Sequence, residues 1–273
     1  DLEHLTMKID QKLEEGIAFH QANLLHQAEQ VYQEILQALP QHADALHLLG
    51  VIAYQEKEHQ IAANLITQAI KIDSTQYSFF NNLGLVLKGQ EKLDQAVQAF
   101  HQSIEINPRF TEGHNNLGIV LQKQDKLNEA IQAYRWAIEI KPDNIEACYN
   151  LGKLLQQKGQ LDEAIQVFRR AIEHHPNDAE MYYHLGTTLH KQERLQQAAQ
   201  AYRQAIELQS SHAEAHYNLG LALQEQEQFD QAVQIYQQAI AFQPNFIDPY
   251  NNLGVLLKKQ RKFDQAIQVY RQA

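Results

Sequence analysis

The sequence is poor in the features that mark several common classes of protein. It has a single cysteine, Cys148, so it forms no internal disulfide and is not a disulfide-stapled secreted scaffold. Its apolar runs are far shorter than the roughly 18–20 residues that span a membrane, and the mean hydropathy is −0.50. No signal peptide is visible at Asp1. We therefore expect a cytoplasmic protein without membrane insertion.

Positive charge and catalytic motifs are scarce as well. The chain has 33 acidic residues against 23 lysines and arginines, a formal net charge of −10. Phosphate-binding surfaces need an excess of cations, so we expect no nucleic-acid partner. The few serines occur in no G-x-S-x-G context, and neither a P-loop nor a G-x-G-x-x-G motif is present. We expect a protein that is not an enzyme and that has no cofactor.

The fourteen histidines raise the question of a metal site. The sharpest candidate is the pair His212 and His216 around Glu214. No third nitrogen or sulfur ligand is near in sequence, although structural zinc sites need four ligands. His174 and His175 are expected to be solvated at the end of a helix. We interpret these histidines as structural and predict no metal site.

Glycine is infrequent, but its spacing is regular. Eight of the eleven glycines stand 34 residues apart: Gly16, Gly50, Gly84, Gly118, Gly152, Gly186, Gly220 and Gly254. An alanine follows each after twelve residues, and a large apolar residue, usually aromatic, stands four further on. Proline stands 24 residues after the glycine in five repeats. A fixed period of this length indicates a repeat architecture.

This spacing divides residues 9–273 into seven full repeats and a truncated eighth, after a lead-in at residues 1–8. The repeats start at residues 9, 43, 77, 111, 145, 179, 213 and 247. Apolar residues fall at helical spacing in two stretches of each repeat, as in Tyr149, Leu151 and Leu154. Each repeat is therefore predicted to be a pair of helices. Because one pair cannot bury its apolar stripe alone, the pairs must stack into one all-α solenoid without an internal domain boundary.

The repeat resembles the tetratricopeptide repeat family. That family has a small residue at position 8, alanine at 20, an aromatic at 24 and proline at 32, as in Gly118, Ala130, Tyr134 and Pro142. The resemblance covers residues 9–273 and implies a right-handed superhelical solenoid of antiparallel helix pairs. Small residues at positions 8 and 20 let the two helices approach, and the aromatic fills the space beside them.

Some positions depart from the pattern. Lys12 and Glu15 occupy positions that are usually buried, so the first repeat is expected to be an N-terminal cap. Cys148 falls at packing position 4 and is interpreted as a buried structural thiol. Trp136 stands at position 26, where other repeats have polar residues, and is expected to be exposed on the outer face.

The last repeat stops at position 27, so we expect its stacking face to be uncovered. The residues expected there are Leu253, Leu257, Ala266 and Tyr270. Such a face would be either a boundary of a longer protein or a contact with another copy of the chain.

The resemblance implies that positions 2, 5, 6, 9, 12 and 13 of each first helix face the inner, concave surface. Asparagine and tyrosine predominate at positions 5 and 6. The predicted peptide-binding residues are Asn81, Asn82, Asn115, Asn116, Tyr149, Asn150, Lys153, Tyr183, His184, Tyr217, Asn218, Asn251 and Asn252. Asparagine is a mediocre helix former whose amide needs partners. We therefore expect these amides to bind the backbone of an extended ligand rather than to pack.

Charge is also ordered on this surface. Position 2 is acidic in nearly every repeat, and lysines recur at positions 9, 12 or 13: Lys88, Lys123, Lys153, Lys191, Lys258 and Lys259. An acidic rim and a basic side are therefore expected. The lysine or arginine at position 2 with which the chaperone-binding members of the family hold a C-terminal carboxylate is replaced by Asp or Glu in seven repeats and by Ser78 in the other.

The primary interpretation is a protein-protein interaction scaffold that binds an extended peptide segment of a partner along the asparagine-lined face. Consecutive asparagines also resemble the repeat region of O-linked N-acetylglucosamine transferases, which implies an alternative: a substrate-recruiting arm of a larger bacterial glycosyltransferase. A third interpretation is a scaffold that self-assembles through its solenoid ends.

Overall fold

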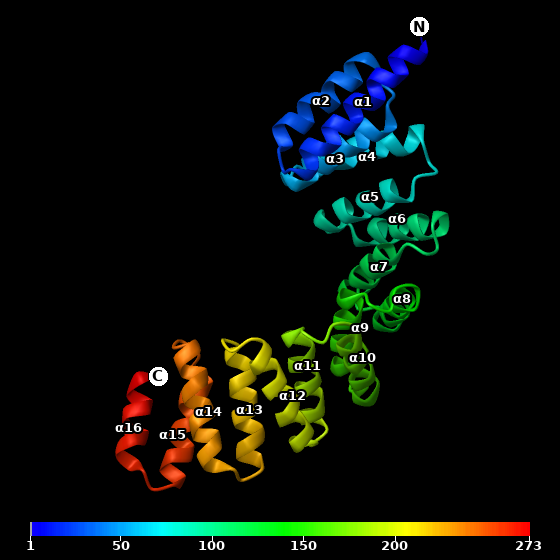
Figure 1. The fold of residues 1–273 in the computed structure, drawn as a ribbon. Coiled ribbons are helices and arrows are strands. Elements are labelled where there is room, and N and C mark those ends of the chain that lie inside the picture. The colour runs from blue at the N-terminus through cyan, green and yellow to red at the C-terminus, as the bar shows by residue number, and fades with distance from the viewer. Residues whose placement is uncertain (1) are drawn as a thin grey trace. The chain divides into compact units, whose positions relative to one another are not determined.

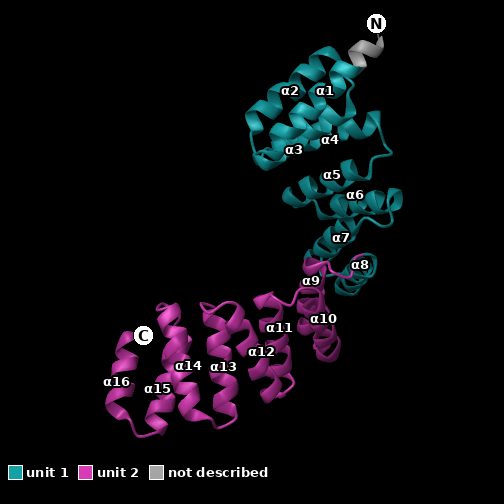
Figure 2. Cartoon of the chain, in the orientation of Figure 1, with its two compact units in different colours: residues 1–140 teal, residues 141–273 magenta. Residues whose placement is uncertain are grey.

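The computed structural model describes residues 2–273, with side chains described from Met7 onward; Asp1, in the expected lead-in, lies outside the described residues. Every regular element in residues 2–273 is an α-helix (Figure 1). The chain divides into two compact units, residues 1–140 and residues 141–273 (Figure 2). Each unit is described by itself.

Unit 1 contains four helix pairs. Its helices are α1 (Leu2–Gln21), α2 (Leu25–Ala38), α3 (Ala43–Gln55), α4 (His59–Ile72), α5 (Tyr77–Gly89), α6 (Leu93–Ile106), α7 (Thr111–Lys123) and α8 (Leu127–Ile140). Unit 2 contains four more pairs. Its helices are α9 (Ile145–Gln157), α10 (Leu161–His174), α11 (Ala179–Lys191), α12 (Leu195–Leu208), α13 (Ala213–Glu225), α14 (Phe229–Phe242), α15 (Ile247–Lys259) and α16 (Phe263–Gln272).

Each predicted repeat is one pair of helices, so the all-α solenoid of repeats is confirmed. From the second repeat on, the first helix begins at the first residue of the predicted repeat, as α3 does at Ala43 and α9 at Ile145. Helix α1 begins earlier, at Leu2, inside the expected lead-in. The expectation of one continuous solenoid without a domain boundary stays a prediction.

The two helices of a pair meet where a glycine of the first lies under a large side chain of the second, an aromatic ring in seven pairs and Ile66 in the other. A Cβ added to Gly152 would lie 2.3 Å from the Phe168 ring, and one added to Gly84 would lie 2.6 Å from Phe100. The alanines at position 20 are buried in every repeat, from Ala28 to Ala266. Small residues therefore permit the close approach, as the pattern predicts, and the aromatic ring lies directly on the glycine.

The turn between the helices of a pair uses a left-handed residue at position 15. Gly159 has φ of +73°, and the equivalent residues of the other repeats, such as Lys57, Glu91 and Asp125, have φ between 57° and 66°. The next backbone N–H closes the turn: Lys92 N donates to Leu87 O at 3.0 Å. This is a Schellman motif, which satisfies carbonyls at the helix end.

Glutamine side chains join neighbouring repeats at the same turns. Each one ends a first helix and donates from Nε2 to an aspartate in the second helix of the preceding repeat. The bonds are Gln124 to Asp94 at 2.8 Å, Gln192 to Asp162 at 2.9 Å and Gln260 to Asp230 at 3.0 Å. The contact therefore recurs within both units as a link between one pair and the next.

At the N-terminal end, the first repeat is polar where others are apolar. Lys12 is exposed and pairs with Glu34, and Glu15 is exposed as well. Their equivalents in the fourth repeat, His114 and Leu117, are buried. This polarity is what the sequence predicts for an N-terminal cap.

The expected composition of the C-terminal face is wrong for three residues. Leu253, Leu257 and Ala266 are buried, because they lie between α15 and α16 or against the preceding repeat rather than on the open side. Tyr270 is exposed as expected. It shares that exposure with Val255, Phe263 and Ile267.

The glycine contact gives a first prediction. Gly152→Ala should destabilise unit 2 by about 1–3 kcal/mol, because the added methyl overpacks a fully buried ring, and this should outweigh the gain of about 1 kcal/mol in helix propensity. Urea unfolding followed by circular dichroism measures the change.

Gly159→Asn is the matched control. No atom lies within 4 Å of a Cβ at Gly159, and asparagine tolerates the left-handed conformation. Equal unfolding midpoints for the parent and Gly152→Ala would contradict the proposed role of the glycine.

Candidate functional site

The predicted site residues recur at the same two positions of successive first helices within each unit. We call this set the polar row: the residues at positions 5 and 6 of repeats three to eight. Its members are Asn81, Asn82, Asn115, Asn116, Tyr149, Asn150, Tyr183, His184, Tyr217, Asn218, Asn251 and Asn252. Lys153 lies one helical turn beyond Tyr149. Part of the row belongs to unit 1 and part to unit 2.

In unit 1 the amides of the polar row bind one another. Asn116 Nδ2 donates to Asn81 Oδ1 at 3.0 Å, so α7 is linked to α5. Asn82 Nδ2 contacts His47 Nε2 at 2.8 Å and links α5 to α3. Asn81 and Asn115 are 7% and 3% exposed. The expectation that these asparagines have no packing role is therefore wrong for Asn81 and Asn115.

In unit 2 the same register joins asparagine to tyrosine. Asn218 Nδ2 donates to the Tyr183 hydroxyl at 3.2 Å, and Asn252 Nδ2 donates to the Tyr217 hydroxyl at 3.1 Å. In both pairs the donor stands 35 residues after the acceptor, one repeat and one residue along. The hydrogen bonds therefore run between successive first helices.

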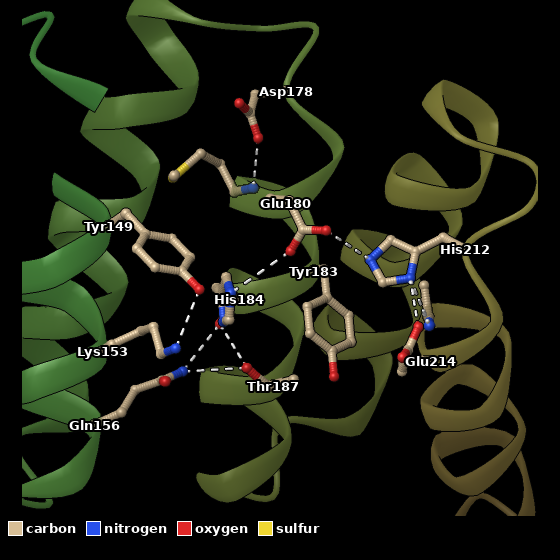
Figure 3. A network of polar contacts seen from close by, with 12 residues as sticks. Tyr149, Lys153, Gln156, Asp178, Glu180, Tyr183, His184, Thr187, His212 and Glu214 are labelled. Atoms are coloured by element: carbon tan, nitrogen blue, oxygen red, sulfur yellow. Dashed lines mark hydrogen bonds and ion pairs between the residues drawn. The ribbon is translucent and has the colours of Figure 1, made fainter. Parts of the chain in front are cut away.

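The first contact between repeats along the polar row in unit 2 is between two aromatic rings. The His184 ring meets the Tyr149 ring edge-on, with centroids 4.9 Å apart. Lys153 Nζ donates to the Tyr149 hydroxyl at 3.1 Å and lies 4.8 Å from the centre of the same ring. All three side chains are half-buried and lie together where α9 meets α11 (Figure 3).

The residues around His184 form a connected polar network. Gln156 Nε2, from α9, donates to His184 O at 3.2 Å and to Thr187 Oγ1 at 3.1 Å. The hydroxyls of Thr187 and Thr188 donate to the same carbonyl at 2.9 and 2.6 Å. Figure 3 shows Gln156 reaching across to α11. The network anchors the helix turn that carries His184.

His184 is neutral at physiological pH. Burial, together with Lys153 and His212, lowers its pKa to about 4, although Asp178 opposes the shift. Glu180 Oε2 is 3.7 Å from His184 Nε2. Because the Glu180 side chain is 53% exposed, water screens its charge, and burial prevails over the pairing.

His212 caps helix α13. Its Nδ1 accepts from Ala215 N at 3.4 Å, so the ring proton is on Nε2, which lies 3.4 Å from Glu180 Oε1 without hydrogen-bond alignment. His216 Nδ1 lies 3.0 Å from His212 O. Glu180 and Glu214 of the expected acidic rim flank His212 (Figure 3). Both histidines therefore have structural contacts.

Other residues singled out in the sequence are also placed. Cys148 is 1% exposed, and burial raises the pKa of its thiol to about 11 although Arg170 opposes the shift. It is thus a protonated core residue. Asn150 is half-buried and Asn251 is exposed. Within residues 2–273 no three histidine, cysteine or acidic side chains converge as metal ligands, and none of the helices has the length and hydropathy to cross a membrane.

Comparison with known families and structures fits this geometry. The family model of the cilia and flagella-associated protein 70 C-terminal domain matches residues 6–218, and single tetratricopeptide repeat models match residues 213–246 and 235–268. The chain belongs to this tetratricopeptide repeat family. The reference to cilia belongs to the protein after which the family is named. Among curated proteins, no sequence matches the chain significantly.

Solved structures of tetratricopeptide repeat proteins share the fold. The C-terminal part of a TPR repeat-containing protein from Cytophaga hutchinsonii has a TM-score of 0.75 at 14% identity and covers 88% of this chain and 99% of its own. YrrB, described as a TPR protein with an unusual peptide-binding site, has a TM-score of 0.60 at 23% identity over 70% of this chain and 98% of its own. MamA has a TM-score of 0.55 at 28% identity over 57% and 91%. The glycosyltransferase and self-assembly alternatives stay predictions.

The buried histidine gives a second prediction. A folded-state pKa near 4, against 6.5 for a free histidine, means that the unfolded chain binds the extra proton first as the pH falls. The stability that neutral His184 contributes is therefore complete above pH 6.5 and is lost toward pH 4, by about 2 kcal/mol at pH 5.

Asn150 and Asn218 stand at the same position of the neighbouring repeats as His184. His184→Asn should therefore reduce the difference between the urea midpoints at pH 7 and pH 5. The exposed His174→Asn is the control and should retain the parent's difference. If both variants retained it, the assignment of the acid sensitivity to His184 would be wrong.

Proposed function

We propose that the chain is a protein-interaction scaffold and that an extended peptide segment of a partner binds along the polar row of unit 2. The observation that carries this proposal is the hydrogen bonding of two tyrosine hydroxyl groups. Tyr183 and Tyr217 each accept a hydrogen bond from an asparagine of the next repeat. A hydroxyl that accepts in this way still has its own hydrogen to donate, here to a carbonyl of the ligand.

Both hydroxyls remain donors over the physiological pH range. Burial, followed by the charge of Glu214, raises the pKa of Tyr183 above its usual value. Burial and Asp248 do the same for Tyr217. The asparagines hold the oxygens in place, so the two donors are oriented before a ligand arrives. Preorganisation of this kind lowers the entropy that binding costs.

The rest of the row suits a protein ligand. Each amide that donates to a neighbouring repeat keeps a second N–H and an oxygen, the pair of groups that a peptide unit can match. The half-buried tyrosine rings add apolar area at a small cost in side-chain entropy. Because these contacts address the backbone, the proposed site tolerates many side chains in the ligand.

Two further features support the proposal. The row is flanked by the exposed carboxylates Glu180 and Glu214 and by the ammonium group of Lys153, so side chains of either sign find a partner. YrrB, which has the same fold, is described as having a peptide-binding site. We extend that type of ligand to this chain.

The third prediction tests the two hydroxyls. Peptides are selected on the immobilised chain from a random twelve-residue library, and the tightest is measured by fluorescence anisotropy. Tyr183→Phe and Tyr217→Phe should each weaken its binding by about 0.5–1.5 kcal/mol, because each removes one neutral hydrogen bond.

Tyr182→Phe is the matched control, since Tyr182 neighbours Tyr183 but stands at packing position 4. Its affinity should equal that of the parent. If the double variant Tyr183→Phe with Tyr217→Phe bound the peptide as tightly as the parent did, the polar row would not be the binding site.

A further inference from the structure

Trp136 stands outside the polar row, on the second helix of the fourth repeat. It is the only tryptophan in the chain, and it is 53% exposed, as the sequence predicts. The same position in the other repeats is polar. Its occupants there are Glu34, Gln68, Gln102, Arg170, Gln204, Gln238 and Gln272. The repeat therefore does not require an aromatic ring at this place.

Two hollows of unit 1 meet at Trp136. The first, of about 450 Å³, is lined by Pro108, Arg109, His114, Trp136, Glu139 and Ile140. The second, of about 340 Å³, lies between α6 and α8 over α7. Its floor and walls include Ile104, Leu117, Leu121 and Ala133 as well as the indole ring. Both consist entirely of unit 1 residues.

The two hollows differ in charge. The first contains one cation, Arg109, and one anion, Glu139, so it selects for neither sign. In the second, Glu129 is the one Asp, Glu, Lys or Arg side chain among the lining residues. The other polar groups there are His101, His114 and Gln132, and His114 Nε2 is held 2.9 Å from Pro108 O.

An indole ring, a carboxylate and an aliphatic floor together match one kind of side chain. Lysine and arginine bury an apolar stem while their charged group stays paired or hydrated. A cation over the face of tryptophan is attracted to the ring by about 0.5–2 kcal/mol. A wholly apolar occupant would instead remove water from Glu129 without offering it a partner, which is unfavourable.

We propose that the hollow between α6 and α8 binds a basic side chain of a partner protein, with the stem on Leu117 and Ala133 and the cation between Trp136 and Glu129. The site is formed by the second helices α6 and α8, with the first helix α7 between them. It shares no residue with the polar row, so this proposal and the proposed peptide site are tested independently of each other. The partner segment is therefore one that carries an exposed lysine or arginine.

The single tryptophan makes the site directly observable. The probes are two blocked pentapeptides, acetyl-Gly-Leu-Arg-Leu-Gly amide and its citrulline analogue, which keeps the shape of arginine without the charge. The arginine peptide should change the fluorescence of Trp136 saturably. Its affinity should be at least fivefold higher than that of the citrulline peptide. No saturable change, or equal affinity for the two peptides, would overturn the proposal.

Variants locate the contact, with fluorescein-labelled arginine peptide followed by anisotropy. Trp136→Gln, the residue of five other repeats, and Glu129→Gln should each weaken binding at least fivefold while circular dichroism stays unchanged. Glu163→Gln removes the same charge at the same position of the next repeat and should leave the affinity within twofold of the parent.

Two outcomes of this series would refute the site. If Glu163→Gln weakened binding as much as Glu129→Gln, the peptide would respond only to the net negative charge of the chain. If Glu139→Gln weakened binding and Glu129→Gln did not, the cation would occupy the other hollow.

Discussion

The structure depends on one contact, a large side chain from the second helix of each pair lying on a glycine of the first; it is an aromatic ring in seven pairs and Ile66 in the other. At Gly118 and Gly220 a Cβ would be 2.6 and 2.5 Å from the tyrosine ring above it. This contact sets the distance between the two helices. The spacing of the pair, together with the rotation between adjacent pairs, determines which side chains of successive first helices meet. Dispersion and burial hold each pair together, and the polar contacts between pairs depend on that packing.

The polar row has two roles that draw on the same atoms. One N–H of Asn116, Asn218 or Asn252 links its repeat to the one before, and the remaining groups are those proposed for a ligand. A half-buried polar group without a partner is costly, so a row bonded within itself is stable before any ligand arrives. Substituting an asparagine would thus alter stacking as well as binding. The tyrosine hydroxyls are the better probes because one atom of each can be removed alone.

The period of 34 residues predicts eight helix pairs and their boundaries, since the first helices from α3 to α15 begin where the repeats begin. It also predicts the close approach at the small residues and the buried Cys148, whereas the structure shows that the aromatic ring lies on the glycine rather than beside it. It does not predict that Asn116 reaches Asn81, because that contact depends on the rotation between adjacent pairs, which a single repeat does not encode. The left-handed turn is not predicted either, because only Gly159 and Asn23 are residue types that favour it, while charged residues adopt it in the six other repeats. The hollows beside Trp136 depend on side chains from α6, α7 and α8 together.

The left-handed turns lower the stability of the fold. Seven non-glycine residues hold a conformation that is disfavoured by roughly 1–2 kcal/mol for most side chains, and Lys57, Glu91, Glu193 and Arg261 are exposed there. Each is a small local strain that recurs with the repeat. Removing the strain at one turn would stabilise the fold only slightly. Removing it at all of the turns would give a larger total gain in stability. The chain therefore has a margin for higher thermostability that is spread over the turns of its repeats.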